Sequence, residues 1–198
     1  METKRALTLK IMKLLLPAFV MALIAAQIVV GQNPTMTGDP YAPRGNPRSP
    51  DSKYMWVVKT GPSIAYQLIT NSSNAVLATV PAYYPQPDPD NLKYAKAYGV
   101  FWNSVGTIVA LDELNRRRSG ELYFFAVQDG RAKQIRVGAL IPRPPSAVET
   151  RLVVDPGWQS ETKIRLRQSV RKRDGDFMDN FYLVDFTNPT RPKIEEAK

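Results

Sequence analysis

Residues 121–137 read ELYFFAVQDGRAKQIRV and predict a β-hairpin. The run Glu121–Val127 is rich in aromatic and β-branched side chains, which favour strands, and Lys133–Val137 supplies a second short run. Between them stands Asp129-Gly130, a pair that readily adopts the positive backbone angles of a tight hairpin turn. We therefore expect two antiparallel strands joined at these two residues.

The same pattern extends along the chain on both sides of this hairpin. Short apolar runs separated by Gly, Asn, Asp or Pro recur through residues 49–198, and no long helical pattern follows residue 31. Such spacing is typical of an antiparallel all-β domain. We predict a meander of antiparallel strands, either propeller-blade-like or sandwich-like. The expected core includes Trp56, Trp102, Tyr123, Phe125, Tyr182 and Val184.

The composition excludes several kinds of chemistry. The chain has 198 residues, with 27 Lys and Arg against 18 Asp and Glu, and it contains neither Cys nor His. Disulfides, thiolate catalysis, Cys/His zinc sites and His-based catalytic triads are therefore excluded. The sequence also holds no glycine-rich phosphate loop, so we expect no cofactor and no bound metal.

The first 31 residues predict export. Basic residues up to Lys13 precede an apolar run over residues 14–30, which is the pattern of a secretory signal peptide. Cleavage is expected after Gly31, or near Ala26 as the second choice. Alternatively the run stays uncleaved as a membrane anchor, although its 17 residues are at the short limit for a bilayer span. Membrane contact is expected only through this run.

A proline-rich linker is predicted at residues 32–48, followed by the all-β domain at 49–198. Four prolines and two glycines in the linker exclude a helix or a central strand. The chain is then periplasmic or extracellular, and its formal charge of +9 favours an anionic envelope component or another protein as partner. No nucleic acid partner is expected in that location.

A turn followed by strands recurs three times along the domain. The three turns begin at Ser49, Asn103 and Gln159, which lie 54 and 56 residues apart. Each turn leads into an outgoing strand, a hairpin and a returning strand. This spacing predicts an internal repeat.

The turn Ser49-Pro50-Asp51-Ser52-Lys53, with Glu121–Phe125 and the following Asp129-Gly130, resembles the blade repeat of TolB-type β-propellers. In that repeat a Ser-Pro-Asp-Gly-Lys turn precedes a strand, so Ser52 stands where Gly is usual. The resemblance covers about residues 49–137 and implies a fold, not an activity. Propellers have four to eight blades, so three units imply a sandwich or an association of copies.

The candidate acids are expected to serve structure. Asp112 and Glu113 are predicted at a solvated turn held by ion pairs to Arg116–Arg118, and only secondarily as a catalytic pair. A second acidic cluster combines alternate Asp residues with a glycine, as calcium loops do. Three basic residues directly precede it, so we expect a hairpin. The cluster consists of Asp174, Asp176, Asp179 and Asn180.

One strand carries a stripe of cations. Over residues 163–171, Ile164, Leu166 and Val170 alternate with cationic positions, which must therefore lie on the opposite face. These cations either guard an exposed sheet edge against pairing or form a docking face for an anionic partner. The cations are Lys163, Arg165, Arg167 and Arg171.

A second candidate binding feature is the aromatic loop that begins at Tyr83 and Tyr84. Alternating prolines at 85, 87 and 89 favour an extended, preorganised path. The two tyrosines either fold back onto the core or serve as exposed anchors for a partner.

These observations predict an exported or membrane-tethered, non-catalytic binding or scaffolding module of the bacterial envelope. Two other classes compete with this interpretation. One is a carbohydrate-active hydrolase, which needs two carboxylates facing each other across a cleft. The other is a purely structural subunit, which needs a large apolar patch.

Overall fold

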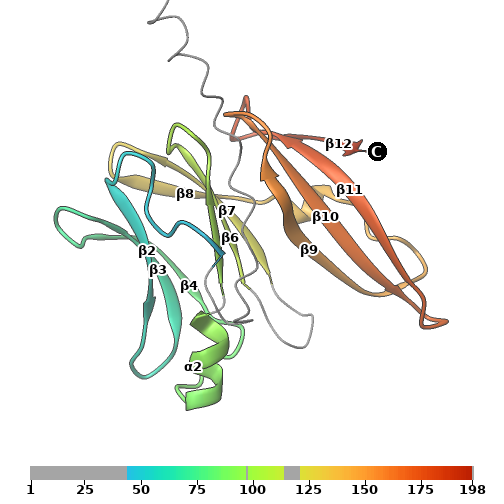
Figure 1. Cartoon of the computed structure of the whole chain (residues 1–198), viewed down its shortest axis with the longest axis horizontal. Coiled ribbons are helices and arrows are strands. Elements are labelled where there is room, and N and C mark those ends of the chain that lie inside the picture. Colours follow the sequence, from blue (N-terminus) through green and yellow to red (C-terminus); the bar gives the residue numbers. More distant parts are fainter. Residues whose placement is uncertain (1–43, 97, 114–120, 198) are drawn as a thin grey trace, which may run out of the picture. The chain divides into compact units, whose positions relative to one another are not determined.

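The computed structural model describes residues 44–96, 98–113 and 121–197. These residues form three largely antiparallel β-sheets with one short α-helix and one 3-10 turn, so the predicted all-β class is confirmed (Figure 1). The predicted export segment at 1–31, the linker residues 32–43 and the arginines at 116–118 lie outside the described residues.

The first sheet has three antiparallel strands in the order β2-β3-β4. A tight turn at residues 71–74 joins β3 to β4, and Asn74 adopts a positive φ of 54° there. Asn residues tolerate this left-handed conformation better than most residue types. The strands are β2 (Tyr54–Lys59), β3 (Ala65–Thr70) and β4 (Val76–Pro81).

The middle sheet has five strands in the order β1-β5-β6-β7-β8. Only β1 runs parallel to its neighbour, and the remaining pairs are antiparallel. The predicted Asp129-Gly130 turn joins β7 to β8, with positive φ values of 50° and 69°. The strands are β1 (Arg44–Gly45), β5 (Gly99–Trp102), β6 (Ile108–Asp112), β7 (Leu122–Gln128) and β8 (Arg131–Ile135).

The last sheet has four antiparallel strands in the order β12-β11-β10-β9. A tight hairpin at residues 173–176 joins β10 to β11, as predicted for the acidic cluster. The 3-10 turn η1 (Gly138–Leu140) precedes this sheet in the chain. The strands are β9 (Ala147–Trp158), β10 (Lys163–Lys172), β11 (Phe177–Asp185) and β12 (Lys193–Ala197).

Two hydrophobic cores hold the three sheets together, one on each face of the middle sheet. All five residues of β6 are buried, because alternate side chains enter opposite cores. The first core, against the first sheet, contains Trp56, Tyr66, Leu68, Val109, Leu111 and Phe125 among others. The second core, against the last sheet, contains Ile108, Phe124, Ile164, Leu166, Tyr182, Val184 and Phe186 among others.

The predicted core residues fall into two groups. Four of the six are buried, whereas Trp102 and Tyr123 are only partly buried and pack against the first core. Trp102 stacks on Tyr54 with ring centroids 6.3 Å apart. The prediction that these two rings are core residues thus overestimated how completely neighbouring strands cover them.

The first two of the three repeated turns share the same hydrogen bonds. Ser49 N donates to the carbonyl of Tyr54 at 2.9 Å, and Asn103 N donates to that of Ile108 at 2.9 Å. In both turns the side-chain oxygen of the first residue accepts the amide five residues on, at 3.0 Å. Both first residues are buried, with 2% and 1% of their surface exposed. The offset of 54 residues is therefore a repeat of conformation.

The fourth residue of each of these turns is left-handed. Ser52 has φ 58° and Gly106 has φ 71°, and each donates its amide to the first carbonyl of its turn. At the third turn Gln159 N instead donates to the Lys163 carbonyl, and the Ser160 hydroxyl oxygen accepts the Lys163 amide. The third turn is thus shorter by one residue.

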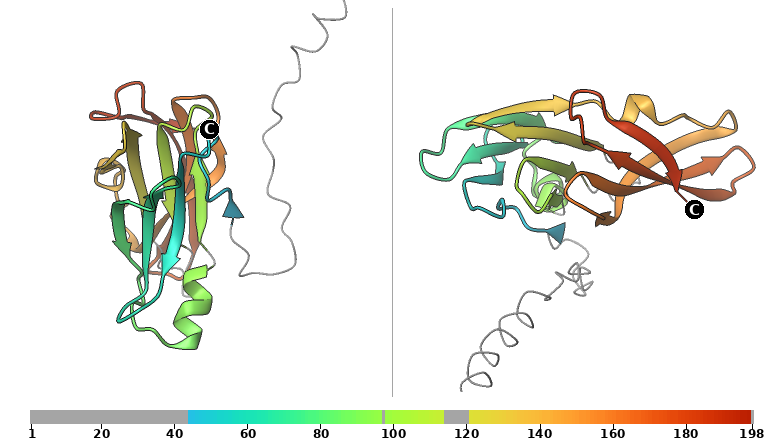
Figure 2. Two further views of the ribbon diagram at one scale, coloured as in Figure 1. Left: turned by 90° about the vertical axis from the view of Figure 1, so that its left-hand side faces the viewer. Right: turned by 90° about the horizontal axis from the view of Figure 1, so that it is seen from above.

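Two short elements lie beside the sheets. Residues 44–48 belong to the fold, since β1 pairs with β5 and Arg48 forms a bridge to Met55. The helix α2 (Pro89–Lys96) is capped by the Asp88 carboxylate, which accepts the Asn91 amide at 2.9 Å. Figure 2 shows α2 at one end of the strands.

Candidate functional site

The cations of β10 lie together on the outward face of the last sheet, opposite the second core. Ile164, Leu166 and Val170 are fully buried on the inward face, so the alternation predicted from the sequence is present. We call the outward side the charged face. It consists of Glu149 and Asp155 on β9, Lys163, Arg165, Arg167, Ser169 and Arg171 on β10, and Asp179, Phe181, Leu183 and Asp185 on β11.

The charged face does not guard a sheet edge, so that interpretation is wrong. Strand β10 is hydrogen-bonded to β9 on one side and to β11 on the other, over nearly its whole length. Edge protection requires charges on a strand whose backbone groups are unpaired. The sequence could not show this, because strand order depends on contacts between distant segments.

Most cations of the charged face are paired with acids on the neighbouring strands. Arg171 Nε lies 3.1 Å from Glu149, and Lys163 Nζ lies 3.7 Å from Asp185. Arg167 contacts two carboxylates, at 2.9 Å to Asp155 and 3.3 Å to Asp179. Exposed pairs of this kind contribute about 0–1 kcal/mol each. Their main effect is to fix the positions of the side chains.

Arg165 differs from the other three cations. Its guanidinium lies over the ring of Phe181, 4.3 Å from the centroid. Among the described residues it has no carboxylate within ion-pair distance. Stacking of this kind contributes about 0.5–1 kcal/mol at an exposed site and leaves the guanidinium N–H groups available to a partner.

We call the aromatic loop that begins at Tyr83 and Tyr84 the tyrosine loop. Hydrogen bonds to other segments hold its base. Ile64 N donates to the Pro85 carbonyl at 2.7 Å, and Tyr83 N donates to Glu113 Oε1 at 2.6 Å. Tyr83 is 47% exposed, and its ring meets Tyr84 edge-on with centroids 4.9 Å apart. Neither ring belongs to either core, which removes the alternative in which both fold back onto the core.

The two candidate acids are buried, which corrects the expectation of a solvated turn. Asp112 ends β6, whose two faces are covered by the cores, and none of its surface is exposed. Arg44 Nη2 donates to Asp112 Oδ2 at 2.7 Å, and Arg151 Nη2 lies 3.8 Å from Oδ1. Val154 N on β9 also donates to Asp112 at 3.4 Å. One carboxylate thus links β1, β6 and β9.

Glu113 occupies a different environment from its neighbour. Its carboxylate accepts hydrogen bonds from Tyr83 N and from the Tyr66 hydroxyl, the latter at 3.4 Å. Burial raises the pKa of Glu113, and these two hydrogen bonds offset the rise only in part. Burial and the nearby Glu113 also raise the pKa of Tyr66. The acid therefore anchors the tyrosine loop to the first core.

These contacts give the acid pair structural roles. A glycoside hydrolase needs a proton donor and a second carboxylate on opposite sides of a cleft. Asp112 is bound to two arginines, and Glu113 is bound to a loop amide and a tyrosine. Sequence reasoning missed Arg44 and Arg151 as partners because they lie far from Asp112 along the chain, and no local pattern indicates them.

The acidic hairpin is closed by its own hydrogen bonds. Asp176 N donates to Asp174 Oδ1 at 3.0 Å, and Asp179 contacts Arg167 and Ser169. Within residues 44–96, 98–113 and 121–197, no group of three potential metal ligands is gathered in one place. Nor does this part of the chain contain a helix long and apolar enough to cross a membrane.

Comparison with known proteins adds no family. No family model, no curated protein and no solved structure matches this chain.

Proposed function

We propose that this chain is an exported or membrane-tethered, non-catalytic binding or scaffolding module of the bacterial envelope that docks a protein through its charged face. The observation that carries the proposal is the position of Lys163, Arg165 and Arg167 on the open face of an interior strand. An interior strand has no free edge, so protection against pairing with another chain does not account for these cations.

The chemistry of the charged face suits a protein partner better than a uniformly anionic polymer. Each ion pair adds a carboxylate to the surface, so a polyanion would meet Glu149, Asp155, Asp179 and Asp185 beside the cations. A protein with interleaved charges can complement both signs. Arginine and aromatic side chains dominate binding energy at protein interfaces, which points to Arg165 and Phe181 as the centre.

The proposal also covers how the three sheets relate to one another as structural units. Each sheet is a meander in chain order, except that β1 adds to the edge of the middle one. The same turn precedes β2 of the first sheet and joins β5 to β6 in the middle sheet. Both features are in keeping with blade-like units of the TolB type. We regard the three sheets as such units, stacked without closing a ring.

A pull-down from envelope extract tests the docking face. The double variant Arg165→Glu/Arg167→Glu should lose the captured protein, and binding by the unmodified chain should weaken as salt screens the exposed charges. A matched control, Lys53→Glu/Lys59→Glu, reverses two exposed lysines of the first sheet region and should retain the partner. Identical partner profiles for the two double variants would refute the docking face, provided that both melt cooperatively.

Export is tested separately by mass spectrometry of the envelope fraction. We expect a mature chain that starts near Gln32, or a full-length membrane-bound chain if residues 14–30 remain as an anchor. A full-length chain found in the cytosol would contradict the proposed location.

A further inference from the structure

Apolar residues surround Arg165 on the charged face. Leu183 lies directly opposite it on β11, and the ring of Phe181 lies beneath its guanidinium, with 4.3 Å between Cζ and the ring centroid. On the other side the register of β9 is interrupted at Asp155, whose carboxylate lies 2.9 Å from Arg167 Nε instead. Within the described chain, Arg165 therefore has no ion-pair partner on either neighbouring strand.

One carboxylate of the same face is only partly neutralised. The other paired cations each contact one acid, whereas Arg167 contacts two. Asp155 is the closer of these two, at 2.9 Å, and Asp179 lies at 3.3 Å. The Ser169 hydroxyl donates to Asp179 at 2.6 Å and so fixes its position, while 40% of the Asp179 side chain is exposed. Asp179 can therefore accept a further cation from a partner.

The Arg165 guanidinium and the Asp179 carboxylate are neighbours along β11. Phe181, on which the guanidinium stacks, is two residues from Asp179, and both residues lie on the outward side of the strand. Two residues of a strand span about 7 Å, so we expect the two charges to be about that far apart. Leu183 continues the same side and, like Phe181, is half-buried. The two charges thus lie on a partly apolar surface.

We propose that the protein docked by the charged face places a carboxylate on Arg165 and, about 7 Å away, a basic side chain on Asp179. This inference rests on the proposed function and specifies the chemistry of the partner. One edge of a guanidinium can donate two parallel hydrogen bonds to a carboxylate, and the stack on Phe181 holds that edge in place. The second contact fixes the direction in which the partner lies on the face.

Two other kinds of partner suit this arrangement less well. A polyanion would supply an acid to Arg165 but would place a like charge beside Asp179, which is unfavourable. An apolar surface would cover Phe181 and Leu183 but would remove Arg165 from water without a counter-charge. A segment with one acid and one base complements both charges.

The probe for the first test is the protein captured from envelope extract, identified by mass spectrometry and purified. Arg165→Gln should weaken its binding to the full chain by about 10- to 100-fold, because hydrogen bonds between charged groups are lost. Arg165→Lys should restore only part of the affinity, because an ammonium group cannot donate two parallel hydrogen bonds in one plane. Asp179→Asn should weaken binding by about threefold, because the basic side chain loses its acid.

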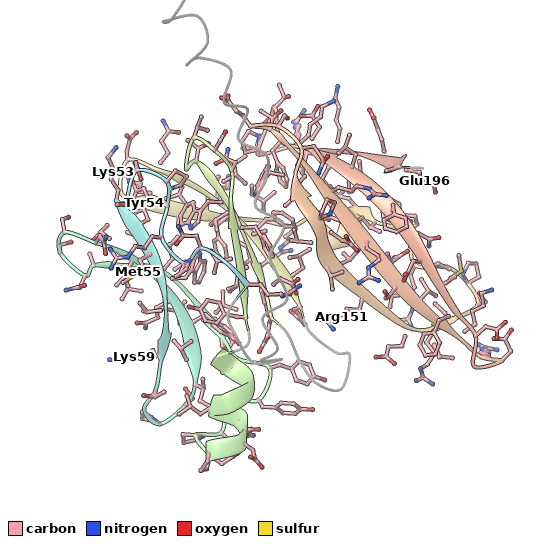
Figure 3. The ribbon with its side chains drawn as sticks, viewed as in Figure 1. Lys53, Tyr54, Met55, Lys59, Arg151 and Glu196 are labelled. Atoms are coloured by element: carbon pink, nitrogen blue, oxygen red, sulfur yellow. The ribbon has the colours of Figure 1, made fainter. Side chains whose placement is uncertain are left out.

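Two variants outside the charged face are matched controls. Lys59→Gln neutralises a cation of β2, labelled on the first sheet in Figure 3. Asp129→Asn neutralises an exposed acid in the turn between β7 and β8, where Asn-Gly is equally suitable. Both should bind as the unmodified chain does, and thermal melts show whether each variant is folded.

The outcomes separate this inference from the proposed function. Unchanged or tighter binding by Asp179→Asn, or full binding by Arg165→Gln, would overturn the acid-and-base pattern even if the double variant Arg165→Glu/Arg167→Glu fails to bind. Full binding by that double variant would refute the docking face itself.

Displayed random peptides provide a second probe that needs no envelope extract. Peptides are selected on the unmodified full chain, and those that also bind Arg165→Gln are removed. The remaining peptides should carry an acid and a base separated by one residue, and they should bind Asp179→Asn more weakly. Peptides that carry acids alone, or the absence of any peptide that depends on Arg165, would overturn the inference.

Discussion

The first and the last sheet pack on opposite sides of the same middle sheet, yet their outward faces differ completely. Both bury large apolar side chains inward, such as Trp56 in the first core and Leu166 in the second. Outward, the first sheet presents Met55 and Val57, whereas the last presents paired cations and acids. The difference shows that a strand's inward residues specify the fold, while its outward residues determine whether the surface suits water or a binding partner.

The alternation along each strand carries this information. In β10 every inward position from Ile164 to Val170 is buried, and Arg165, Arg167 and Ser169 fill the positions between them. In β2 no such alternation exists. The charged outward side of β10 stays hydrated without a free-energy cost, whereas the outward side of β2 exposes apolar surface to water.

The largest difference in stability is expected between truncations on the inward and the outward side of β2. Trp56→Ala should reduce the free energy of unfolding by about 3–5 kcal/mol, because the ring fills the first core and packs on Phe125 with centroids 5.4 Å apart. Met55→Ala, one residue earlier on the outward side, should cost about 1 kcal/mol or less. Urea unfolding at low protein concentration measures both. Equal losses would show that β2 has no distinct inward face.

The next effect compares a buried carboxylate with an exposed one. Asp112→Ala should destabilise the fold by about 3–5 kcal/mol, because it leaves the largely buried Arg151 without its counter-charge. Asp179→Ala on the charged face should cost about 1 kcal/mol or less, because its pair with Arg167 is solvated. The same urea titrations test this. A similar loss at the two positions would mean that Asp112 does not hold β1, β6 and β9 together.

A smaller effect should depend on pH. The folded pKa of Glu113 lies above its ordinary value, so the folded chain holds this proton to higher pH than the unfolded chain does. Stability from this group is therefore present below the ordinary pKa and is lost as pH rises through the folded pKa. Glu113→Gln removes that loss, so its stability relative to the unmodified chain should increase as pH rises from about 4.

Urea titrations of both chains across this pH range make the measurement. The two stability curves should converge at acidic pH and separate towards neutral pH. Parallel curves would show that Glu113 ionises as freely in the folded chain as in the unfolded one.

The smallest effect concerns the repeated turn. Ser52 adopts a left-handed conformation that strains a residue with a Cβ, so Ser52→Gly should stabilise the fold by about 1 kcal/mol or less. Gly106→Ala at the equivalent position should destabilise by about 1–2 kcal/mol for the same reason, since its Cβ would meet nothing closer than Pro50 Cδ at 3.4 Å. Thermal melts of the two variants make the comparison. Shifts of the same sign would show that the two turns are not equivalent.

Much of the fold could be predicted because it rests on local chemistry. Asp129-Gly130 forms its turn from its own backbone preferences, and the alternation in residues 163–170 reflects one buried face. The offset of 54 residues between two turns was visible as similar composition and corresponds to shared hydrogen bonds. These features depend on residues close together in the chain.

The candidate site was only partly predictable, because its character depends on which strands become neighbours. From the sequence alone, Arg167 was one of four cations on a strand that might have been an edge. The structure places it between Asp155 and Asp179, on two different strands. Similarly, the sequence suggested local arginines for Asp112, whereas the described partners are Arg44 and Arg151.

The sequence by itself determined that the chain forms short antiparallel strands, which side of each strand is apolar, and that Cys and His chemistry is absent. Only the tertiary structure decided that Asp112 and Glu113 are buried, that β10 is interior, and that two end sheets expose opposite kinds of surface. The physical reason is the range of the interactions. Turn preferences and alternation act over a few residues, whereas burial and ion pairing depend on segments that only folding brings together.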